Sequence, residues 1–213
     1  GKSTLIGVLS KGALDNGRGL ARMQVFRYNH EVENGRTSSI STHQLYFDDH
    51  GAVLNPSGCM RPLSPPQLMQ EASKVLTFID LAGHEKYLKT TVTGILGRSP
   101  EYCMLVIAAN SGVQPMTGEH LGIPLVLSLP LFCVVTKTDL VSEEKLAETM
   151  QTLRAVIHNA EKVLVNIHTE ADIVELMARS DLNDCVAVFL ASSVTGDKLD
   201  LLRRFLFMLP ARL

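Results

Sequence analysis

Two short groups of residues carry side chains suited to phosphate chemistry. The chain opens with GKST at residues 1–4, and DLAG at residues 80–83 ends a later apolar run. A lysine ammonium can contact phosphate oxygens, serine and aspartate oxygens can hold Mg²⁺, and a glycine N–H can donate to a phosphate. We therefore expect phosphate contacts from Gly1, Lys2, Ser3, Thr4 and Gly83. We expect Mg²⁺ to be bound by the Ser3 hydroxyl, with the Asp80 carboxylate close to the ion behind its direct ligands.

Two later motifs predict the base. TKTD at residues 136–139 follows an apolar run, and so does SSVTG at residues 192–196. Guanine presents two adjacent donors, N1–H and its amino group, which one carboxylate can accept together, whereas adenine has no such pair. Backbone N–H groups of the serine-rich turn can contact the guanine O6. We expect guanine contacts from Thr136, Lys137, Asp139, Ser192, Ser193 and Val194.

His84 directly follows Gly83 and is the candidate catalytic residue. From this position an imidazole can orient the water that attacks the γ-phosphate, a task that glutamine performs in small GTPases. The other histidines show no spacing typical of metal ligands, so we expect them to be structural.

These motifs follow strands that alternate with helices. Apolar runs predict strands at 74–80, 102–109, 131–136, 163–167 and 186–191. Helical periodicity predicts helices at 85–96, 117–129, from Ser142 through Ile157, at 170–179 and at 199–209. This order predicts an α/β fold with a doubly wound, mostly parallel sheet and helices on both faces. Together with the four motifs, it indicates a fold of the P-loop NTPase type, a G domain. Since ligands bind at the carboxyl ends of such strands, Asp80, Asp139 and Ser192 should meet at one sheet edge.

The first part of the chain is less regular. A helix should begin at Lys2, followed by a flexible switch region over about residues 15–43, a strand at 44–48 that returns through 52–54, and a proline-rich surface insertion at about 55–66. We expect one domain over residues 1–213. The chain starts inside a G-x-x-x-x-G-K-S/T motif, so we expect the first strand to be missing and nucleotide binding by this stretch alone to be weak.

Composition narrows the function classes. The 213 residues are 46% hydrophobic, the net charge is −2, and no apolar run reaches the roughly 20 residues of a membrane span. We expect a cytoplasmic protein with no membrane or DNA partner. The cysteines at 59, 103, 133 and 185 form no C-x-x-C pair, and Cys103 and Cys133 should be buried thiols, not metal ligands.

The motif set resembles the translational GTPases related to elongation factor Tu and elongation factor 1-alpha. Within them, HEVENGRTSSIS at 30–41, FIDLAGHEKYLKTT at 78–91 and SSVTGDKLDLL at 192–202 resemble the eukaryotic family of GTP-binding proteins one and two. The resemblance implies Mg²⁺-dependent GTP binding and hydrolysis to GDP, stimulated by the ribosome or a ribosome-bound RNA–protein complex. It also implies a larger protein in which further domains follow.

The chain departs from these factors at two places. Ala82 stands where elongation factors usually have proline, which gives the loop more backbone freedom. Their switch loop usually reads Arg-Gly-Ile-Thr-Ile, and an ungapped match places residues 36–40 there. Ser39 would then be the Mg²⁺ ligand, with Thr37 as the alternative, and the sequence alone does not choose.

Two functions fit these observations. The first is a GTPase, and the second is a GTP-binding scaffold or regulatory module with little turnover. Only the first needs His84. A metabolic kinase or ATPase with a P-loop is disfavoured by Asp139.

Overall fold

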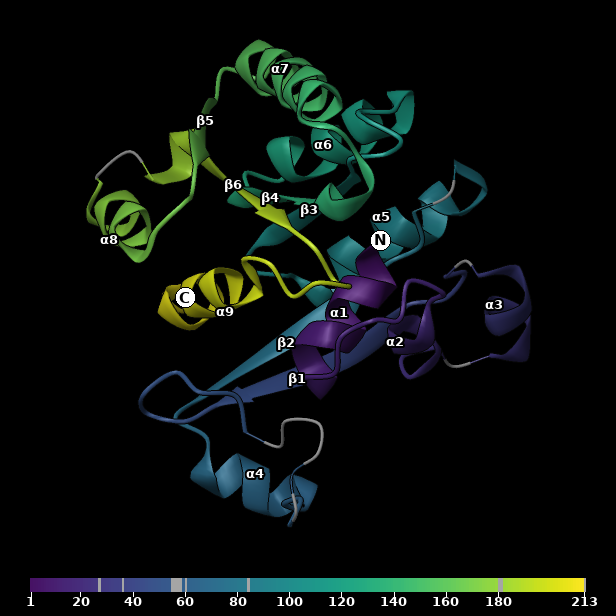
Figure 1. Ribbon diagram of the computed structural model, residues 1–213, viewed down its shortest axis with the longest axis vertical. Coiled ribbons are helices and arrows are strands. Elements are labelled where there is room, and N and C mark those ends of the chain that lie inside the picture. Colours follow the sequence, from purple (N-terminus) through teal and green to yellow (C-terminus); the bar gives the residue numbers. More distant parts are fainter. Residues whose placement is uncertain are drawn as a thin grey trace. The chain divides into compact units, whose positions relative to one another are not determined.

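The structure, a computed structural model, describes residues 1–26, 28–35, 37–54, 59, 61–83, 85–179 and 182–212. The chain forms two compact units, which we describe separately (Figure 1). The C-terminal unit comprises Gly1, residues 99–202 and the chain from Pro210 onward. The N-terminal unit comprises residues 2–98 and 203–209.

The C-terminal unit is built on a parallel four-stranded sheet. Its strands, in spatial order, are β3 (Cys103–Ala108), β4 (Leu131–Thr136), β6 (Cys185–Ala191) and β5 (Val163–Asn166). The connecting helices are α6 (Pro115–Val126), α7 (Glu143–Asn159) and α8 (Glu170–Ala178), and α9 (Leu199–Met208) follows β6. Parallel strands joined through helices confirm the predicted α/β fold class.

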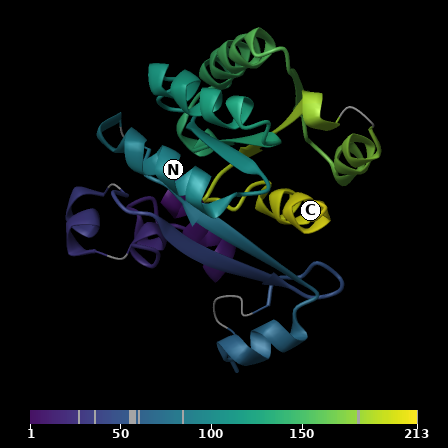
Figure 2. The same cartoon turned by 180° about the vertical axis from the view of Figure 1, so that it is seen from behind.

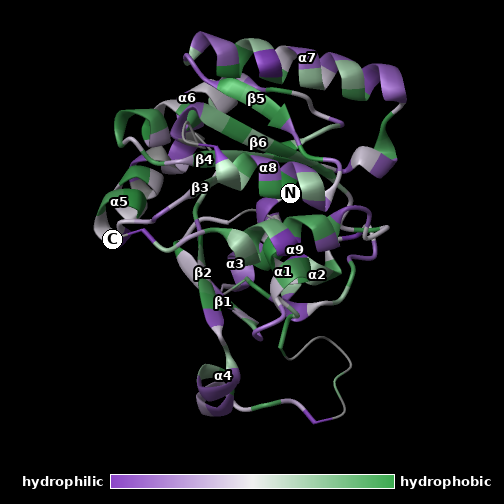
Figure 3. Cartoon of the chain, turned by 90° about the vertical axis from the view of Figure 1, so that its left-hand side faces the viewer, coloured by the Kyte–Doolittle hydropathy of each residue, from purple (hydrophilic) through white to green (hydrophobic). Residues whose placement is uncertain are grey.

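The core of this unit lies around β4, which is buried on both of its faces. All six residues of β4 are buried, so neither face of this strand meets water. On one face Leu121 of α6 and Leu153 and Ile157 of α7 pack against the strands. Ser142 caps α7, accepting a hydrogen bond from the Lys145 N–H at 3.4 Å. Hydrophobic and hydrophilic residues alternate along α7 in Figure 3, as this one-sided packing requires.

The N-terminal unit begins with α1 (Lys2–Lys11) and the short helices α2 (Leu20–Met23) and α3 (Asn29–Asn34). Strand β1 (Ser41–Phe47), helix α4 (Pro65–Glu71), strand β2 (Lys74–Asp80), a 3₁₀ turn (Glu85–Tyr87) and α5 (Leu88–Arg98) follow. β1 and β2 lie side by side (Figure 2). They are antiparallel, with Ser41 opposite Asp80 and Phe47 opposite Lys74. α1 packs against both strands.

Several predictions for this unit need correction. β1 begins at Ser41 instead of residue 44, and the expected return strand at 52–54 is reduced to one bridge between Phe47 and Val53. Two short helices lie within the predicted switch region. α4 overlaps the end of the proline-rich stretch, of which residues 55–58 and 60 lie outside the described part. Prolines occupy its first turn, where a missing N–H costs no helical hydrogen bond.

The largest correction concerns β2. It pairs with β1 in a separate two-stranded sheet and is not a strand of the parallel sheet. The expectation that Asp80 shares a sheet edge with Asp139 and Ser192 is therefore wrong for Asp80. A run of apolar residues looks the same in either kind of sheet, and the pairing is set by β1, which the sequence pattern only partly revealed.

In the C-terminal unit α6 begins two residues before its predicted start and includes Pro124. Cys133 and Cys185 are buried, and Cys103 is half-buried. Burial raises the pKa of the Cys103 thiol to about 11 and that of Cys133 to about 12, so both are protonated at neutral pH. Among the described helices, none is long and apolar enough to cross a bilayer.

Candidate functional site

In the N-terminal unit the fold brings Lys2 against Gly83. A Cβ placed on Gly83 would lie only 2.7 Å from Lys2 Nζ, closer than side chains approach one another. Glycine therefore lets the lysine ammonium reach the backbone at the end of the Asp80–Gly83 turn. Because α1 begins at Lys2, Ser3 and Thr4 stand in its first turn, where backbone N–H groups have no helical acceptor and can bind an anion.

Beside this turn, two hydroxyls and one carboxylate form a buried cluster. Ser3 Oγ donates to Asp80 Oδ2 at 2.6 Å and lies 2.7 Å from Thr37 Oγ1. Thr37 Oγ1 lies 3.5 Å from the same carboxylate oxygen. Asp80 is only 2% exposed, and its other oxygen has no hydrogen-bond partner among the residues that the structure describes. An uncompensated buried carboxylate oxygen is costly, which indicates that this cluster is built to receive a ligand.

This donor set fits Mg²⁺. It consists of oxygens alone, and its single carboxylate leaves coordination positions for water and phosphate, the arrangement that Mg²⁺ favours. Ser3, Thr37 and Asp80 could hold the ion. Ser39, the other sequence candidate, points its hydroxyl elsewhere and donates to Glu31 Oε1 at 3.0 Å. The structure thus places Thr37 with Ser3 and Asp80, and leaves Ser39 out.

Glu31 is a residue that sequence reasoning missed. It lies in the first turn of α3, is 1% exposed, and its Oε1 accepts hydrogen bonds from the N–H and hydroxyl groups of both Ser38 and Ser39. Burial raises the pKa of Glu31, but these hydrogen bonds outweigh burial and lower the pKa to about 2. Glu31 is therefore charged at neutral pH. A glutamate in a polar stretch carries no sequence signal for such a role.

The lowered pKa predicts acid sensitivity of residues 38–39. A carboxyl whose folded pKa lies near 2 and whose ordinary value is 4.5 stabilises the fold above pH 4.5, and that contribution is lost as the pH falls toward 2. Amide-exchange protection of Ser38 and Ser39, followed by NMR, should fall across this window. Protection that is unchanged down to the lower limit would contradict the bonding to Glu31.

In the C-terminal unit the two base motifs lie at the same end of the sheet. β4 and β6 are neighbouring parallel strands with Thr136 opposite Ala191, so residues 137–139 and 192–194 leave the sheet together. Ser192 is 1% exposed, and its Oγ donates to Asp139 Oδ1 at 2.6 Å. The same Oγ accepts from the backbone N–H groups of Val194 at 3.2 Å and Thr195 at 3.1 Å. Ser192 thus links the exposed Asp139 carboxylate by hydrogen bonds to the backbone of residues 194–195.

Further residues of the base motifs shape this end of the sheet. Lys137 has a φ of 61°, a left-handed conformation that turns the chain between β4 and the 3₁₀ turn at Thr138–Leu140. The Thr136 hydroxyl donates to the Ile107 carbonyl at 3.2 Å. A Cβ on Gly1 would lie 3.6 Å from that hydroxyl, so the Gly1 backbone lies beside Thr136. Ser193 is half-buried and Val194 is 39% exposed.

The candidate catalytic residue, His84, lies outside the described residues. The residues before it are well anchored, although Ala82 stands where elongation factors usually have proline. Ala82 is 1% exposed, and its carbonyl accepts a hydrogen bond from the buried Thr91 hydroxyl at 2.6 Å. Thr91, on α5, is a second residue that sequence reasoning missed, because its partner is a backbone atom.

The Ser192–Asp139 bond yields a testable prediction. Ser192→Ala should weaken GTP binding by roughly 10- to 100-fold, since a hydrogen bond to a charged group contributes about 1.5–3 kcal/mol. Ser193→Ala is the matched control and should bind as the wild type does, because we expect Ser193 to act through its backbone. Titration calorimetry measures both affinities. Equal binding by the two variants would show that the Asp139 orientation does not depend on Ser192.

Comparison with known proteins gives the family. A sequence model of the family described as "Elongation factor Tu GTP binding domain" matches residues 1–211. The chain belongs to this family. The match covers almost the entire chain, so the membership predicted from the motifs is confirmed.

Similar sequences are found among larger proteins. The chain is 45% identical over its whole length to GTP-binding protein 1 of Xenopus laevis and covers 33% of that protein. It is 42% identical to GTP-binding protein 2 of Homo sapiens, with 99% of this chain and 35% of that protein covered. A selenocysteine-specific elongation factor of Desulfomicrobium baculatum is 40% identical to this chain. The match covers 68% of this chain and 24% of that protein. The chain thus spans about a third of the length of GTP-binding proteins 1 and 2.

Solved structures agree on the fold. A bacterial selenocysteine-specific elongation factor, EF-Sec, aligns with 97% of this chain and 26% of its own, at a TM-score of 0.63 and 23% identity. Elongation factor SelB of Methanococcus maripaludis, in complex with the GTP analogue GppNHp, aligns with 100% of this chain and 32% of its own. Its TM-score is 0.57 and its identity 18%. At these identities the likeness shows the fold alone.

Proposed function

We propose that this chain binds GTP and GDP with Mg²⁺ and hydrolyses GTP, as the single GTPase domain of a cytoplasmic, translation factor-like protein. The observation that carries this proposal is the buried cluster of Ser3, Thr37 and Asp80, in which one carboxylate oxygen has no hydrogen-bond partner among the described residues. In the C-terminal unit, the Asp139 carboxylate held by Ser192 supports guanine as the base.

Each residue then has a defined task. The Lys2 ammonium contacts β- and γ-phosphate oxygens, and the N–H of Gly83 donates to the γ-phosphate. Ser3, Thr37 and Asp80 would hold Mg²⁺, which when bound neutralises the charge on the phosphates. His84 orients the water that attacks. Asp139 accepts both guanine donors, with Lys137 along the purine face and residues 192–194 at its O6.

Thr37 and Gly83 are the residues through which the fold would sense the γ-phosphate. Thr37 lies between α3 and β1, in the region of about 15–43, and Gly83 follows β2. Contacts to a γ-phosphate and its Mg²⁺ order such segments, and hydrolysis releases them. In the full-length protein this change would be read by the ribosome or a ribosome-bound RNA–protein complex. The family resemblance is what supports a ribosomal partner for the full-length protein.

The test is GTP binding and single-turnover phosphate release with Mg²⁺, with a chelator, and in Asp80→Asn. Chelation and the substitution should each weaken GTP binding at least 10-fold and abolish turnover, because both remove the charge balance at the phosphates. GTP binding that is unaffected by both treatments would overturn the Mg²⁺ site. Tight, Mg²⁺-dependent binding without turnover, even with ribosomes present, would favour the scaffold function.

A further inference from the structure

Among the described residues, 37–40, which carry Thr37 into the cluster, have no regular secondary structure. α3 ends at Asn34, Gly35 turns the chain with a φ of 63°, and β1 begins only at Ser41. An irregular segment of this kind has few backbone hydrogen bonds to hold it in one conformation. Something outside the segment must fix Thr37 where its hydroxyl meets Ser3 and Asp80.

Glu31 supplies these missing hydrogen bonds. Its Oε1 lies 2.7 Å from the Ser38 N–H nitrogen and 3.0 Å from the Ser39 N–H nitrogen, and it accepts from both hydroxyls at 3.0 Å. Two of these four bonds hold the backbone of the residues immediately after Thr37. A carboxylate that is 1% exposed is costly to bury, and donors at bonding distance compensate this cost.

His30, the residue before Glu31, holds the same segment. Its Nε2 lies 2.7 Å from Ser38 Oγ, and its ring stacks on Tyr28 with centroids 5.5 Å apart. Because the Ser38 hydroxyl donates its proton to Glu31, its oxygen accepts from His30, which places the imidazole proton on Nε2. Two residues in the first turn of α3, His30 and Glu31, therefore both form hydrogen bonds with Ser38.

We propose that Glu31 is a positioning residue for the GTP site: by binding Ser38 and Ser39 from α3, it holds the Thr37 hydroxyl at the Mg²⁺ position formed with Ser3 and Asp80. The same bonds occupy both donors of Ser39 and withdraw its hydroxyl from the metal. Glu31 thereby selects Thr37 over Ser39 as the ligand. This inference rests on the proposed function, since it concerns the Mg²⁺ of that site.

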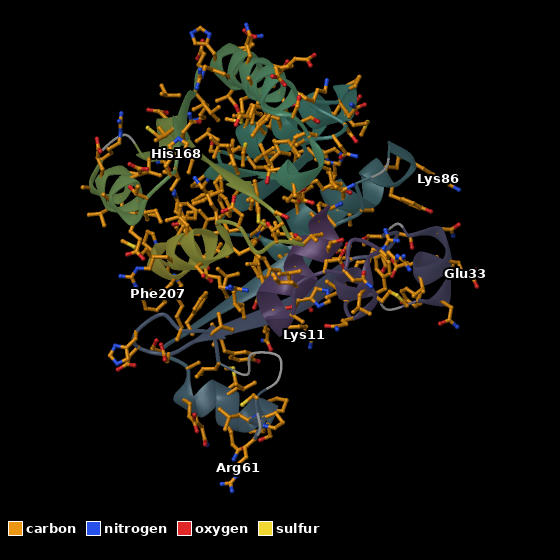
Figure 4. All side chains as sticks on the ribbon, viewed as in Figure 1. Lys11, Glu33, Arg61, Lys86, His168 and Phe207 are labelled. Atoms are coloured by element: carbon orange, nitrogen blue, oxygen red, sulfur yellow. The ribbon has the colours of Figure 1, made fainter. Side chains whose placement is uncertain are left out.

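The test compares Glu31→Gln with Glu33→Gln. Glutamine keeps the shape of Glu31 but removes the charge that four donors require, whereas Glu33 is exposed on the same helix (Figure 4). The quantity measured is the Mg²⁺ concentration that half-saturates GTP binding. Loss of an outer partner of a metal ligand typically weakens metal affinity 10- to 100-fold. We expect that change in Glu31→Gln and the wild-type value in Glu33→Gln.

A double-mutant cycle with Thr37→Ala separates positioning from general destabilisation. If Glu31 acts through Thr37, adding Glu31→Gln to Thr37→Ala should raise the Mg²⁺ requirement no further. An undiminished effect of Glu31→Gln in that background, or none in the wild-type background, would overturn the proposal. If the glutamine variant does not fold, Glu31→Asp keeps the charge but shortens its reach, and the same increase is expected.

Ser39→Ala tests the choice of ligand without altering Glu31. It keeps the N–H bond and should change the Mg²⁺ requirement far less than Thr37→Ala does. A larger effect of Ser39→Ala would overturn the proposal. Failure of the proposed function is distinguishable, because the wild type itself would then show no Mg²⁺-dependent GTP binding.

Discussion

Asp139→Asn should change the preferred base from guanine to xanthine. In the wild type the Ser192 hydroxyl donates to Asp139 Oδ1, so an asparagine would keep its oxygen at Ser192 and turn its amide nitrogen to the base. An amide N–H₂ donates where the carboxylate accepted. It therefore meets the C2 carbonyl of xanthine and leaves the guanine amino group without an acceptor.

The expected effect is large. A site built around paired hydrogen bonds rejects an analogue that lacks them by roughly 10⁴-fold, because its buried polar groups are then left unpaired. Competition of GTP and XTP against a fluorescent guanine nucleotide measures the change in preference. Asp197→Asn, an exposed aspartate in the turn after Ser192, is the control and should keep the wild-type preference. Unchanged GTP preference in Asp139→Asn would remove Asp139 from the base site.

His84→Ala should lower ribosome-stimulated GTP hydrolysis by orders of magnitude while GTP affinity stays nearly unchanged. The imidazole is proposed to contact the attacking water and not the ground-state nucleotide, so its contribution is made chiefly in the transition state. Turnover without a partner should be slow from the outset, because we expect a ribosomal partner to place the imidazole at the attacking water.

Single-turnover phosphate release with and without ribosomes measures this effect, and equilibrium binding measures the affinity. The control is His158→Ala, since His158 is exposed near the end of α7. It should behave as the wild type in both assays. Wild-type stimulated turnover in His84→Ala would support the scaffold function, in which GTP is a structural ligand.

The fold was predictable where burial dictates the pattern. Strands β2 and β4 have their predicted bounds of 74–80 and 131–136. Of the other strands of the parallel sheet, β5 and β6 differ by one residue at one end and β3 by one residue at each end. The pairing of β2 was not predictable, because an apolar run does not specify its neighbour. The short helices α2, α3 and α4 were also missed, because four to seven residues give too little periodicity to detect.

The site was predictable where a motif encodes its chemistry. Three contacts join residues that the motifs had singled out. Lys2 approaches Gly83, Ser3 donates a hydrogen bond to Asp80, and Ser192 donates one to Asp139. The sequence could not choose between Thr37 and Ser39, because both are hydroxyls near the same matched position. In the proposed site the choice depends on Glu31, whose burial is a property of the folded segment and leaves no mark on local composition.

Competition between nucleotides shows whether this chain binds guanine nucleotides in preference to adenine nucleotides. With Mg²⁺ present, GTP and GDP should displace a fluorescent guanine nucleotide at concentrations about 10⁴-fold below those needed with ATP. Displacement by ATP and GTP at equal concentrations would exclude a guanine-specific site.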